Sequence, residues 1–397
     1  MVSNRRILIH DFPGHSFPFQ LSRALSKRGH TVLHAYSKSF QSPKGNFRKR
    51  AEDSKNLSII PITRDESFPK YSLFKRWVAE KTYSKFLLTI VNNFNPDFII
   101  SNNTSIEIQN SLYSYCSKNN IKFINWIQDI YSVGLQQILK VKLPFFGKFF
   151  TMYYKAIEKR LLTNSHHVVV ISEDFLNVIG KWVKNRNITV IENWATIDEL
   201  RPHPKRNYWS IKNGLSDKFC FLYSGTLGMK HNPGVLLKLA KTYKNQDDTI
   251  IVIISEGMNV EWLKTEVTRQ GITNVRFFNY LNYELLPVAL SSADVLIAIL
   301  QKDAWTYSVP SKVLSYHCIG KPLLLSVSKK NLSSKIVKNN YSGLVSEPED
   351  DIEFLNSAEQ LKKDEKLRIE MGINARKYAE HNFNIDNVCR SFQHLLN

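Results

Sequence analysis

Runs of apolar residues alternate with amphipathic stretches along the chain, and this alternation predicts strands that are each followed by a helix. The first apolar run, residues 5–12, leads into a loop with Gly14 and then into an amphipathic helix from Gln20 that ends at Gly29. A second apolar run occupies residues 31–37. Such a strand–helix–strand opening favours a parallel sheet with helices on both faces.

The pattern repeats to the end of the chain, with an interruption at a segment rich in proline and charge, residues 196–207. We interpret that segment as a linker between two doubly wound α/β domains of residues 1–195 and 208–375, with a C-terminal helix at 376–397 that returns to the first domain. The site is expected in the cleft between the domains. The predicted strands lie within residues 96–103, 122–129, 166–175, 188–195, 219–225, 249–257, 275–281, 293–300, 322–328 and 342–350.

Ligands of parallel sheets bind beyond the carboxyl ends of the strands. In the first domain this rule selects one rim of loop residues, which comprises Gly14–His15, Asn102–Thr104, Gln128–Asp129 and Ser172–Glu173.

The segment "FLYSGTLGMKHNPGVLLKLA", residues 221–240, carries the strongest local signal of the second domain. A strand ends at Gly225, a loop carries Gly228 and Lys230, and a helix follows Pro233. Glycines let a backbone approach a ligand closely, and a lysine before a helix start attracts phosphate. The loop is therefore a candidate pyrophosphate site, although its spacing is not that of a P-loop and a plain tight turn remains the alternative.

Two further strand ends carry groups that can bind a nucleoside. Glu256 follows one strand and can accept hydrogen bonds from a ribose or a base. Tyr280 and Leu281 follow the next strand, where backbone groups could contact a base edge. The alternatives are a surface glutamate at a helix start and aromatic residues of the core.

Residues 305–327, "WTYSVPSKVLSYHCIGKPLLLSV", predict a helix that starts at Pro310 and stops at Gly320. Ser308, Ser311 and Lys312 surround the start. The free amides of a helix start attract anions, so Ser311 and Lys312 are candidate diphosphate ligands. Pro310 has no amide hydrogen and shapes the turn.

Composition narrows the function classes. The formal net charge is +19, with an excess of +13 in residues 1–200 (28 Lys and Arg against 15 Asp and Glu) and of +6 in the remainder (26 against 20). A basic half indicates phosphate-bearing partners, unless an AT-rich coding sequence inflates lysine. The positive charge forms no nucleic-acid recognition module. The four cysteines form no CxxC pair, which fits a reducing cytoplasm.

Apolar runs are too short for a signal peptide or a membrane span, so a soluble or peripheral protein is expected. Residues 139–162 mix lysine with aromatic residues in i, i+4 relations, which suggests docking to an anionic leaflet. The alternative is that the rings belong to the core. The residues concerned are Lys142, Phe145, Phe146, Lys148, Phe149, Phe150, Tyr153, Tyr154, Lys155, Lys159 and Arg160.

Taken in order, the motifs resemble the family-4 glycosyltransferases of the GT-B architecture, in which two Rossmann-like domains face each other across a cleft. The similarity runs through "PGHSFPFQLSRALSKRGHTV", "WIQDI", "VVVISEDF" and "VIENWATIDELRP" in the first half and through the glycine loop, "VIISEG", "LPVALSSADVLIAIL" and "VPSKVLSYHCIGKPLLLSV" in the second. Within the family, the chain looks like bacterial enzymes that build O-antigen, capsule or exopolysaccharide repeat units on a polyprenyl-pyrophosphate lipid.

The resemblance implies a retaining, metal-independent transfer of a sugar from a nucleotide diphosphate, with uridine favoured as the base, an N-acetylated or deoxy hexose as a candidate sugar, and no cofactor. It implies that Gly225, Thr226 and Lys230 contact the diphosphate, that Glu256, Tyr280 and Leu281 surround the nucleoside, and that Gly14 and His15 close on the sugar. It also implies a lipid-linked acceptor at the inner face of the cytoplasmic membrane.

Two departures from the family pattern bear on catalysis. Where relatives carry two glutamates eight positions apart, this chain has Tyr307 and Ser315. Where relatives often have His-Asp, it has Gln128-Asp129, and glutamine is no general base. Asp129 is then the candidate polar contact to the acceptor, with a helix cap as the alternative. A catalytically degenerate sugar-nucleotide binder and a nucleotide-sugar 2-epimerase are the competing functions.

Overall fold

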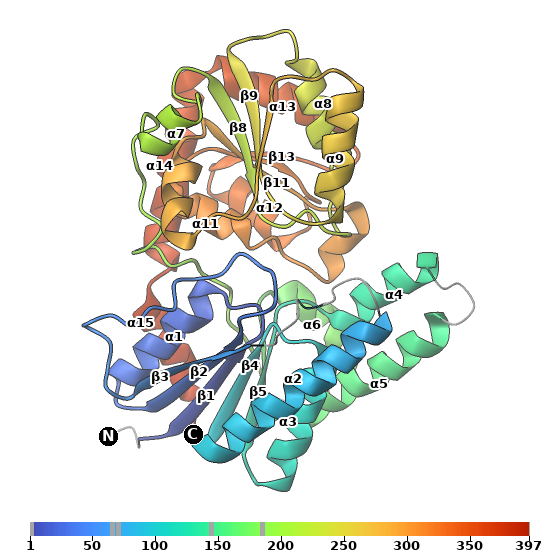
Figure 1. Ribbon diagram of the computed structural model, residues 1–397, viewed down its shortest axis with the longest axis vertical. Helices are drawn as coiled ribbons and strands as arrows, with labels where there is room; N and C mark the ends of the chain where they lie inside the picture. The colour runs from blue at the N-terminus through green and yellow to red at the C-terminus, as the bar shows by residue number, and fades with distance from the viewer. Residues whose placement is uncertain (1–3, 64–67, 69–72, 143–146, 183–186, 397) are drawn as a thin grey trace. The chain divides into compact units, whose positions relative to one another are not determined.

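The computed structural model describes residues 4–63, 68, 73–142, 147–182 and 187–396 and divides the chain into two compact units. Unit 1 comprises Met1–Glu192 together with Ile385–Asn397, and unit 2 comprises Asn193–Asn384. Figure 1 shows both units as sheets covered by helices.

Unit 1 is built on a seven-stranded sheet of order β3-β2-β1-β4-β5-β6-β7, in which every pairing is parallel. The central strands are almost entirely buried, because helices on both faces exclude water from a parallel sheet. The strands are β1 (Arg6–Asp11), β2 (Thr31–Ser37), β3 (Leu57–Ile62), β4 (Phe98–Asn102), β5 (Lys122–Ile127), β6 (His167–Val170) and β7 (Ile188–Val190).

The helices of unit 1 cover two faces of this sheet (Figure 1). On one face, Leu8 and Phe123 pack in a core with α2 and α3. On the other, Trp126 contacts Phe17 of α1 and Phe392 of α15, with ring centroids 5.5 Å and 4.8 Å apart. The helices are α1 (Ser16–Lys27), α2 (Leu73–Phe94), α3 (Ile106–Lys118), α4 (Tyr131–Lys142), α5 (Gly147–Asn164), α6 (Glu173–Ile179) and α15 (Ile385–His394).

Two elements of unit 1 differ from the sequence pattern. Strand β3 was not predicted, because its segment contains Pro61 and mixes polar with apolar positions; as an edge strand it tolerates the missing amide donor. Helix α1 begins at Ser16, four residues before the predicted start, since Pro18 fits the first turn of a helix.

Unit 2 contains a six-stranded parallel sheet of order β10-β9-β8-β11-β12-β13. The predicted doubly wound α/β fold is therefore confirmed in both units. The strands are β8 (Phe219–Ser224), β9 (Thr249–Ile254), β10 (Val275–Phe278), β11 (Val295–Ile299), β12 (Leu323–Ser326) and β13 (Gly343–Ser346).

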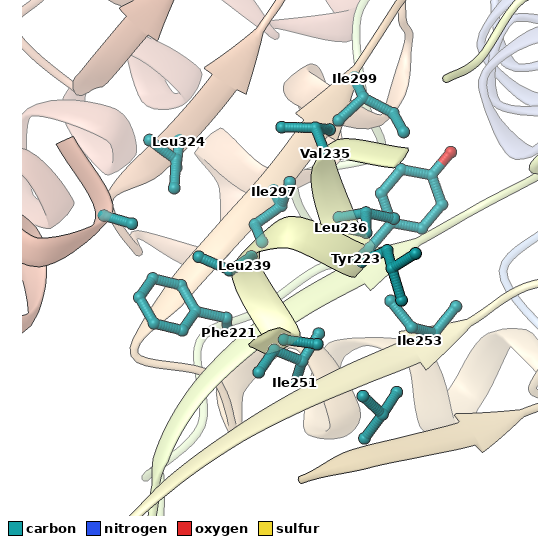
Figure 2. Close-up of a cluster of buried hydrophobic side chains, with 14 of the residues drawn as sticks. Phe221, Tyr223, Val235, Leu236, Leu239, Ile251, Ile253, Ile297, Ile299 and Leu324 are labelled. Atoms are coloured by element: carbon teal, nitrogen blue, oxygen red, sulfur yellow. The ribbon is translucent and has the colours of Figure 1, made fainter. Parts of the chain in front are cut away.

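The core of unit 2 joins the central strands to the helix that follows β8 (Figure 2). Phe221 and Tyr223 of β8 and Ile251 of β9 pack against Leu236 and Leu239 of α8. This packing fixes where the loop between β8 and α8 can run. The helices of unit 2 are α7 (Tyr208–Lys212), α8 (Gly234–Thr242), α9 (Met258–Arg269), α10 (Leu286–Ser291), α11 (Lys312–Ile319), α12 (Leu332–Asn339), α13 (Asp351–Lys363) and α14 (Glu365–Asn382), with short 3₁₀ helices at Tyr283–Leu285 and Lys302–Thr306.

Candidate functional site

The carboxyl ends of β8, β9 and β10, which are neighbouring strands, bring three predicted site residues of unit 2 together. The hydroxyl groups of Thr226 and Tyr280 are 2.5 Å apart. The amide of Tyr280 donates to the carboxylate of Glu256 at 3.3 Å. These contacts join loops that lie up to 54 residues apart in sequence, so the diphosphate and nucleoside candidates belong to one cluster.

The loop from Gly225 to Lys230 is held in place by its neighbours. Gly225 has a φ of +123°, and Gly257 has a φ of +128° with only 2.7 Å between its missing Cβ and the carbonyl oxygen of Leu227. Asn259 donates to the carbonyl groups of Gly228 and His231 at 2.9 and 2.8 Å. Both glycines are therefore required by backbone conformation, and the loop is tied to α9.

Lys230 and Lys312 connect this loop to the start of α11. The ammonium of Lys230 donates to the hydroxyl of Ser308 at 2.6 Å, and Ser308 in turn accepts from Asn331 through its carbonyl group at 2.8 Å. The amine of Lys312 lies 3.6 Å from the ring centroid of Tyr223. Two basic side chains thus flank the glycine loop.

The start of α11 differs slightly from its prediction. The helix begins at Lys312 with Ser311 as its N-cap, and Pro310 precedes it by two residues. It ends at Gly320 in the left-handed conformation, as the sequence indicated. Ser311 is exposed and Ser315 is partly exposed, four residues further along the same helix face.

Leu281 is the remaining predicted residue of the nucleoside group, and it is partly exposed directly after Tyr280. Tyr307 stands where the family pattern has its first glutamate, and it is also partly exposed.

In unit 1 a hydrogen-bonded network gathers most of the predicted rim around Asp11, at the end of β1. The carboxylate of Asp11 accepts from the amide nitrogen of His15 and, at 3.0 Å, from the side chain of Asn102. Gln128 donates to Asn102 at 2.8 Å, and the amide of Gly14 donates to the Asp11 carbonyl group at 3.2 Å. The structure therefore brings Gly14, His15, Asn102 and Gln128 together.

Asp129 and Ser172 are two further positions of the predicted rim. Asp129 is exposed, one residue beyond Gln128. Ser172 caps α6, because its hydroxyl accepts from the amide of Asp174 at 3.2 Å. We therefore assign Ser172 a structural role in the helix start.

Electrostatics set the protonation states at the Asp11 network. Burial raises the pKa of Asp11 to about 7, although hydrogen bonds from His15 and Asn102 oppose that rise. Burial and the nearby ammonium of Lys44 lower the pKa of His15 to about 4. His15 is consequently neutral at pH 7, with an imidazole that can accept a proton.

Sequence reasoning missed Asp11, Lys44 and Tyr316. The hydroxyl of Tyr316 on α11 accepts from the amide of Ser224 at 2.9 Å, which anchors the end of β8. Lys44 donates to the carbonyl groups of Pro13 and Ser37 and thereby holds the Gly14 loop. A charged residue at the end of a buried strand was a signal for Asp11, whereas nothing local marked Lys44 or Tyr316.

The basic-aromatic stretch falls on two helices, the end of α4 and most of α5. Phe145 and Phe146 lie outside the described residues, as does the side chain of Lys142. The side chains of Phe149, Phe150 and Tyr153 are exposed by 72%, 43% and 48%. The alternative that these three rings belong to the core is therefore wrong. Across the part of the chain that the structure describes, no helix has the length and apolarity to cross a membrane.

Comparison with known proteins shows which family part of the chain resembles. Residues 206–378 match the family described as glycosyl transferases group 1. The match covers most of unit 2. The matched region contains the glycine loop, Glu256, Tyr280 and the α11 start.

Curated relatives of this chain are distant. An uncharacterized glycosyltransferase of Methanocaldococcus jannaschii is 23% identical over 67% of the chain, and a putative glycosyltransferase of Bacillus subtilis is 20% identical over 58%. The matched parts span 66% and 60% of those relatives, which is less than two thirds of their length.

Solved structures confirm the GT-B fold over the whole chain. Sucrose-phosphate synthase from Thermosynechococcus elongatus has a TM-score of 0.76 at 15% identity, covering 99% of this chain and 98% of the other. Anabaena HepE in complex with UDP-glucose has a TM-score of 0.72 at 13% identity, covering 99% of both chains. WaaG, a glycosyltransferase involved in lipopolysaccharide biosynthesis, has a TM-score of 0.70 at 13% identity and covers 99% of both.

Proposed function

We propose that this protein is a retaining glycosyltransferase that moves a hexose from a uridine diphosphate sugar to a lipid-linked saccharide during the synthesis of bacterial surface polysaccharide. The observation that carries the proposal is the cluster at the ends of β8, β9 and β10. There the glycine loop, Glu256 and Tyr280 lie together beside Lys230. The solved complex of HepE with UDP-glucose supports a uridine nucleotide as the donor.

Each part of the cluster suits one part of such a donor. The Gly225–Lys230 loop and the start of α11 supply backbone amides and a cation for the diphosphate. Glu256 accepts hydrogen bonds from ribose hydroxyl groups, and the Tyr280–Leu281 segment contacts the base. The carboxylate of Glu256 already receives the Tyr280 amide, so both nucleoside contacts are positioned by one hydrogen bond.

In the proposed reaction, the bond between the anomeric carbon and the diphosphate oxygen breaks, and a bond from that carbon to an acceptor hydroxyl oxygen forms on the same face. The acceptor proton passes to the departing diphosphate. Positive charge and fixed amides near the diphosphate stabilise the charge that develops there, so the step requires no metal ion in this proposal.

Unit 1 is proposed to serve the acceptor. The partly buried His15, neutral at pH 7, and the exposed Asp129 offer polar contacts to a sugar hydroxyl. The exposed rings of α5 lie beside Lys148, which is also exposed, a combination suited to a headgroup layer with anionic lipids. WaaG, whose fold this chain shares, acts in lipopolysaccharide biosynthesis, which supports a surface-polysaccharide role.

A transfer assay tests the proposal. The protein is incubated with a panel of radiolabelled nucleotide sugars and with membranes that contain polyprenyl-pyrophosphate saccharides, and label is then counted in the lipid phase. Transfer from one uridine diphosphate sugar is expected. Absence of transfer from every donor would leave a sugar-nucleotide binder, and release of an epimerised nucleotide sugar would identify a 2-epimerase.

A further inference from the structure

The side chain of Lys312 takes an unusual course for the first residue of a helix. It runs back over the glycine loop, so that a Cβ atom on Gly225 would lie 3.0 Å from its Cε and 3.1 Å from its Nζ. The amine ends 3.6 Å from the ring centroid of Tyr223. That ring is itself fixed, because the Tyr223 hydroxyl donates to the carbonyl group of Thr226 at 2.8 Å.

The amine of Lys312 is buried and makes no hydrogen bond to any atom in the described part of the chain. A buried ammonium normally has a counter-ion or several acceptors, because desolvation is costly. The amine of Lys230, by contrast, has the hydroxyl of Ser308 as a partner at 2.6 Å. Lys312 is therefore a donor group without an acceptor at the point where the proposed donor diphosphate binds.

The surroundings of this amine contain cations and neutral groups. Burial and then the positive charge of Lys230 lower the pKa of Lys312 well below its usual value. Burial lowers the pKa of His231 in the same direction, with Lys312 and Lys230 adding to the effect, and burial raises that of Tyr223. None of the neighbours Lys230, His231 and Tyr223 is an anion at neutral pH.

We propose that Lys312 is the second cation of a two-lysine anion site with Lys230, and that the arrival of a nucleoside diphosphate brings a proton onto the Lys312 amine. This inference rests on the proposed function and names a residue role and a linked protonation within it. The anion supplies both the missing acceptor and the opposite charge, so the ammonium form becomes favoured. The proton comes from solvent, and no covalent bond in the nucleotide changes.

Gly225 belongs to the same arrangement. Its φ of +123° already excludes most side chains, and the contact with Lys312 adds a second reason for glycine at this position. The stem of Lys312 thus occupies the space that any larger residue would take, and its amine is held against the loop rather than in solvent.

Titration calorimetry with UDP tests the inference. Wild-type protein is titrated at pH 7 in PIPES and in imidazole buffers, whose different ionisation enthalpies reveal proton uptake. We expect uptake of up to one proton per bound UDP. In Lys312→Met, which keeps the stem on the Tyr223 ring, the uptake should disappear and the affinity should fall by about tenfold or more. Lys264→Met, at a partly exposed lysine of α9 that pairs with Glu261, is the control, and circular dichroism verifies folding.

The outcomes separate the two levels of the proposal. Wild-type affinity and unchanged proton uptake in Lys312→Met would overturn the role of Lys312 while UDP binding by the wild type stands. Failure of the wild-type protein to bind UDP or any other nucleoside diphosphate would overturn the proposed function, and the inference with it. Binding of UMP as tightly as UDP would also contradict the inference, since a two-cation site favours the diphosphate.

Discussion

The ammonium group of Lys230 donates a 2.6 Å hydrogen bond to the hydroxyl of Ser308, 78 residues further along the chain. This bond ties the loop after β8 to the segment before α11. The bond holds Lys230 where the sequence motif predicts the diphosphate. The position of the Lys230 side chain therefore depends on the loop that carries Ser308.

Replacing Lys230 tests this relationship. Lys230→Ala should lower kcat by about a hundredfold, because one fixed cation near developing negative charge is removed. Ser308→Ala should have a smaller effect in the same direction, since the lysine stays but is less well positioned. Transfer kinetics measure both variants. Lys264→Ala is the matched control, and near-normal turnover in Lys230→Ala would remove this residue from the diphosphate site.

Glu256 and Ser315 make competing predictions for ribose recognition. If Glu256 binds the ribose, Glu256→Ala should weaken UDP binding by about tenfold, since a charged hydrogen-bond partner is lost. Ser315→Ala should then leave the affinity nearly unchanged. Calorimetric dissociation constants for UDP decide between the two residues. A large loss in Ser315→Ala with normal binding in Glu256→Ala would assign the ribose to α11.

The stability of unit 1 should depend on pH through its buried histidines. Burial, with His10 and Arg23, lowers the pKa of His34 to about 3. The folded pKa lies below the ordinary value, so the neutral ring favours the fold above about pH 6.5, and this contribution is lost as pH falls toward 3. The free energy of unfolding should therefore decrease by a few kcal/mol as acid is added, since each pKa unit corresponds to about 1.4 kcal/mol.

His34→Phe is the informative variant, because the ring packs between Phe19 and Phe47 at centroid distances of 5.1 and 5.5 Å. Ser22, which contacts the imidazole, keeps the carbonyl group of Pro18 as a partner. Urea unfolding between pH 7 and 4 should show a shallower loss of stability in this variant. His381→Phe, at an exposed position, serves as the control, and equal slopes in His34→Phe and wild type would refute the assignment.

Membrane docking predicts a loss of binding when the exposed rings of α5 are made polar. The double variant Phe149→Ser, Phe150→Ser should sediment less with vesicles that contain anionic lipid, because two rings no longer enter the headgroup layer. The double variant Ile369→Ser, Ile373→Ser removes exposed apolar side chains from α14 of unit 2 and should bind as the wild type does. Equal sedimentation of both double variants would exclude α5 as the docking helix.

Local pattern predicted most of the fold but not all of the site. The strands after residues 5, 31 and 219 were evident because continuous apolar runs that end in glycine or polar residues are typical of buried parallel strands. Strand β3 was not predicted, since an edge strand with a proline and a solvated side has only a weak hydrophobic pattern. The glycine loop was evident because glycine is favoured where the backbone turns tightly or approaches a ligand, and this preference can be recognised from the local sequence.

The network around Asp11 was harder to foresee. The strand-end rule selected Gly14 and Gln128, but the two are linked through Asn102 and Asp11, the last residue of β1. Similarly, the sequence suggested the backbone amide of Lys312 as a ligand, whereas the structure shows that its side-chain amine is buried at the glycine loop without a hydrogen-bond partner among the described residues. A side-chain direction depends on packing against other elements, and no local pattern specifies it.

The sequence by itself determined which segments become strands and helices, where glycine is required, and which strand ends carry polar groups, because these depend on neighbours a few residues apart. Tertiary structure decided which of those groups meet. Strand order placed Thr226, Glu256 and Tyr280 together, and the packing of α11 brought Lys312 over Gly225. Burial then set the protonation of Asp11, His15 and Lys312, since desolvation arises only when distant segments exclude water from the same atoms.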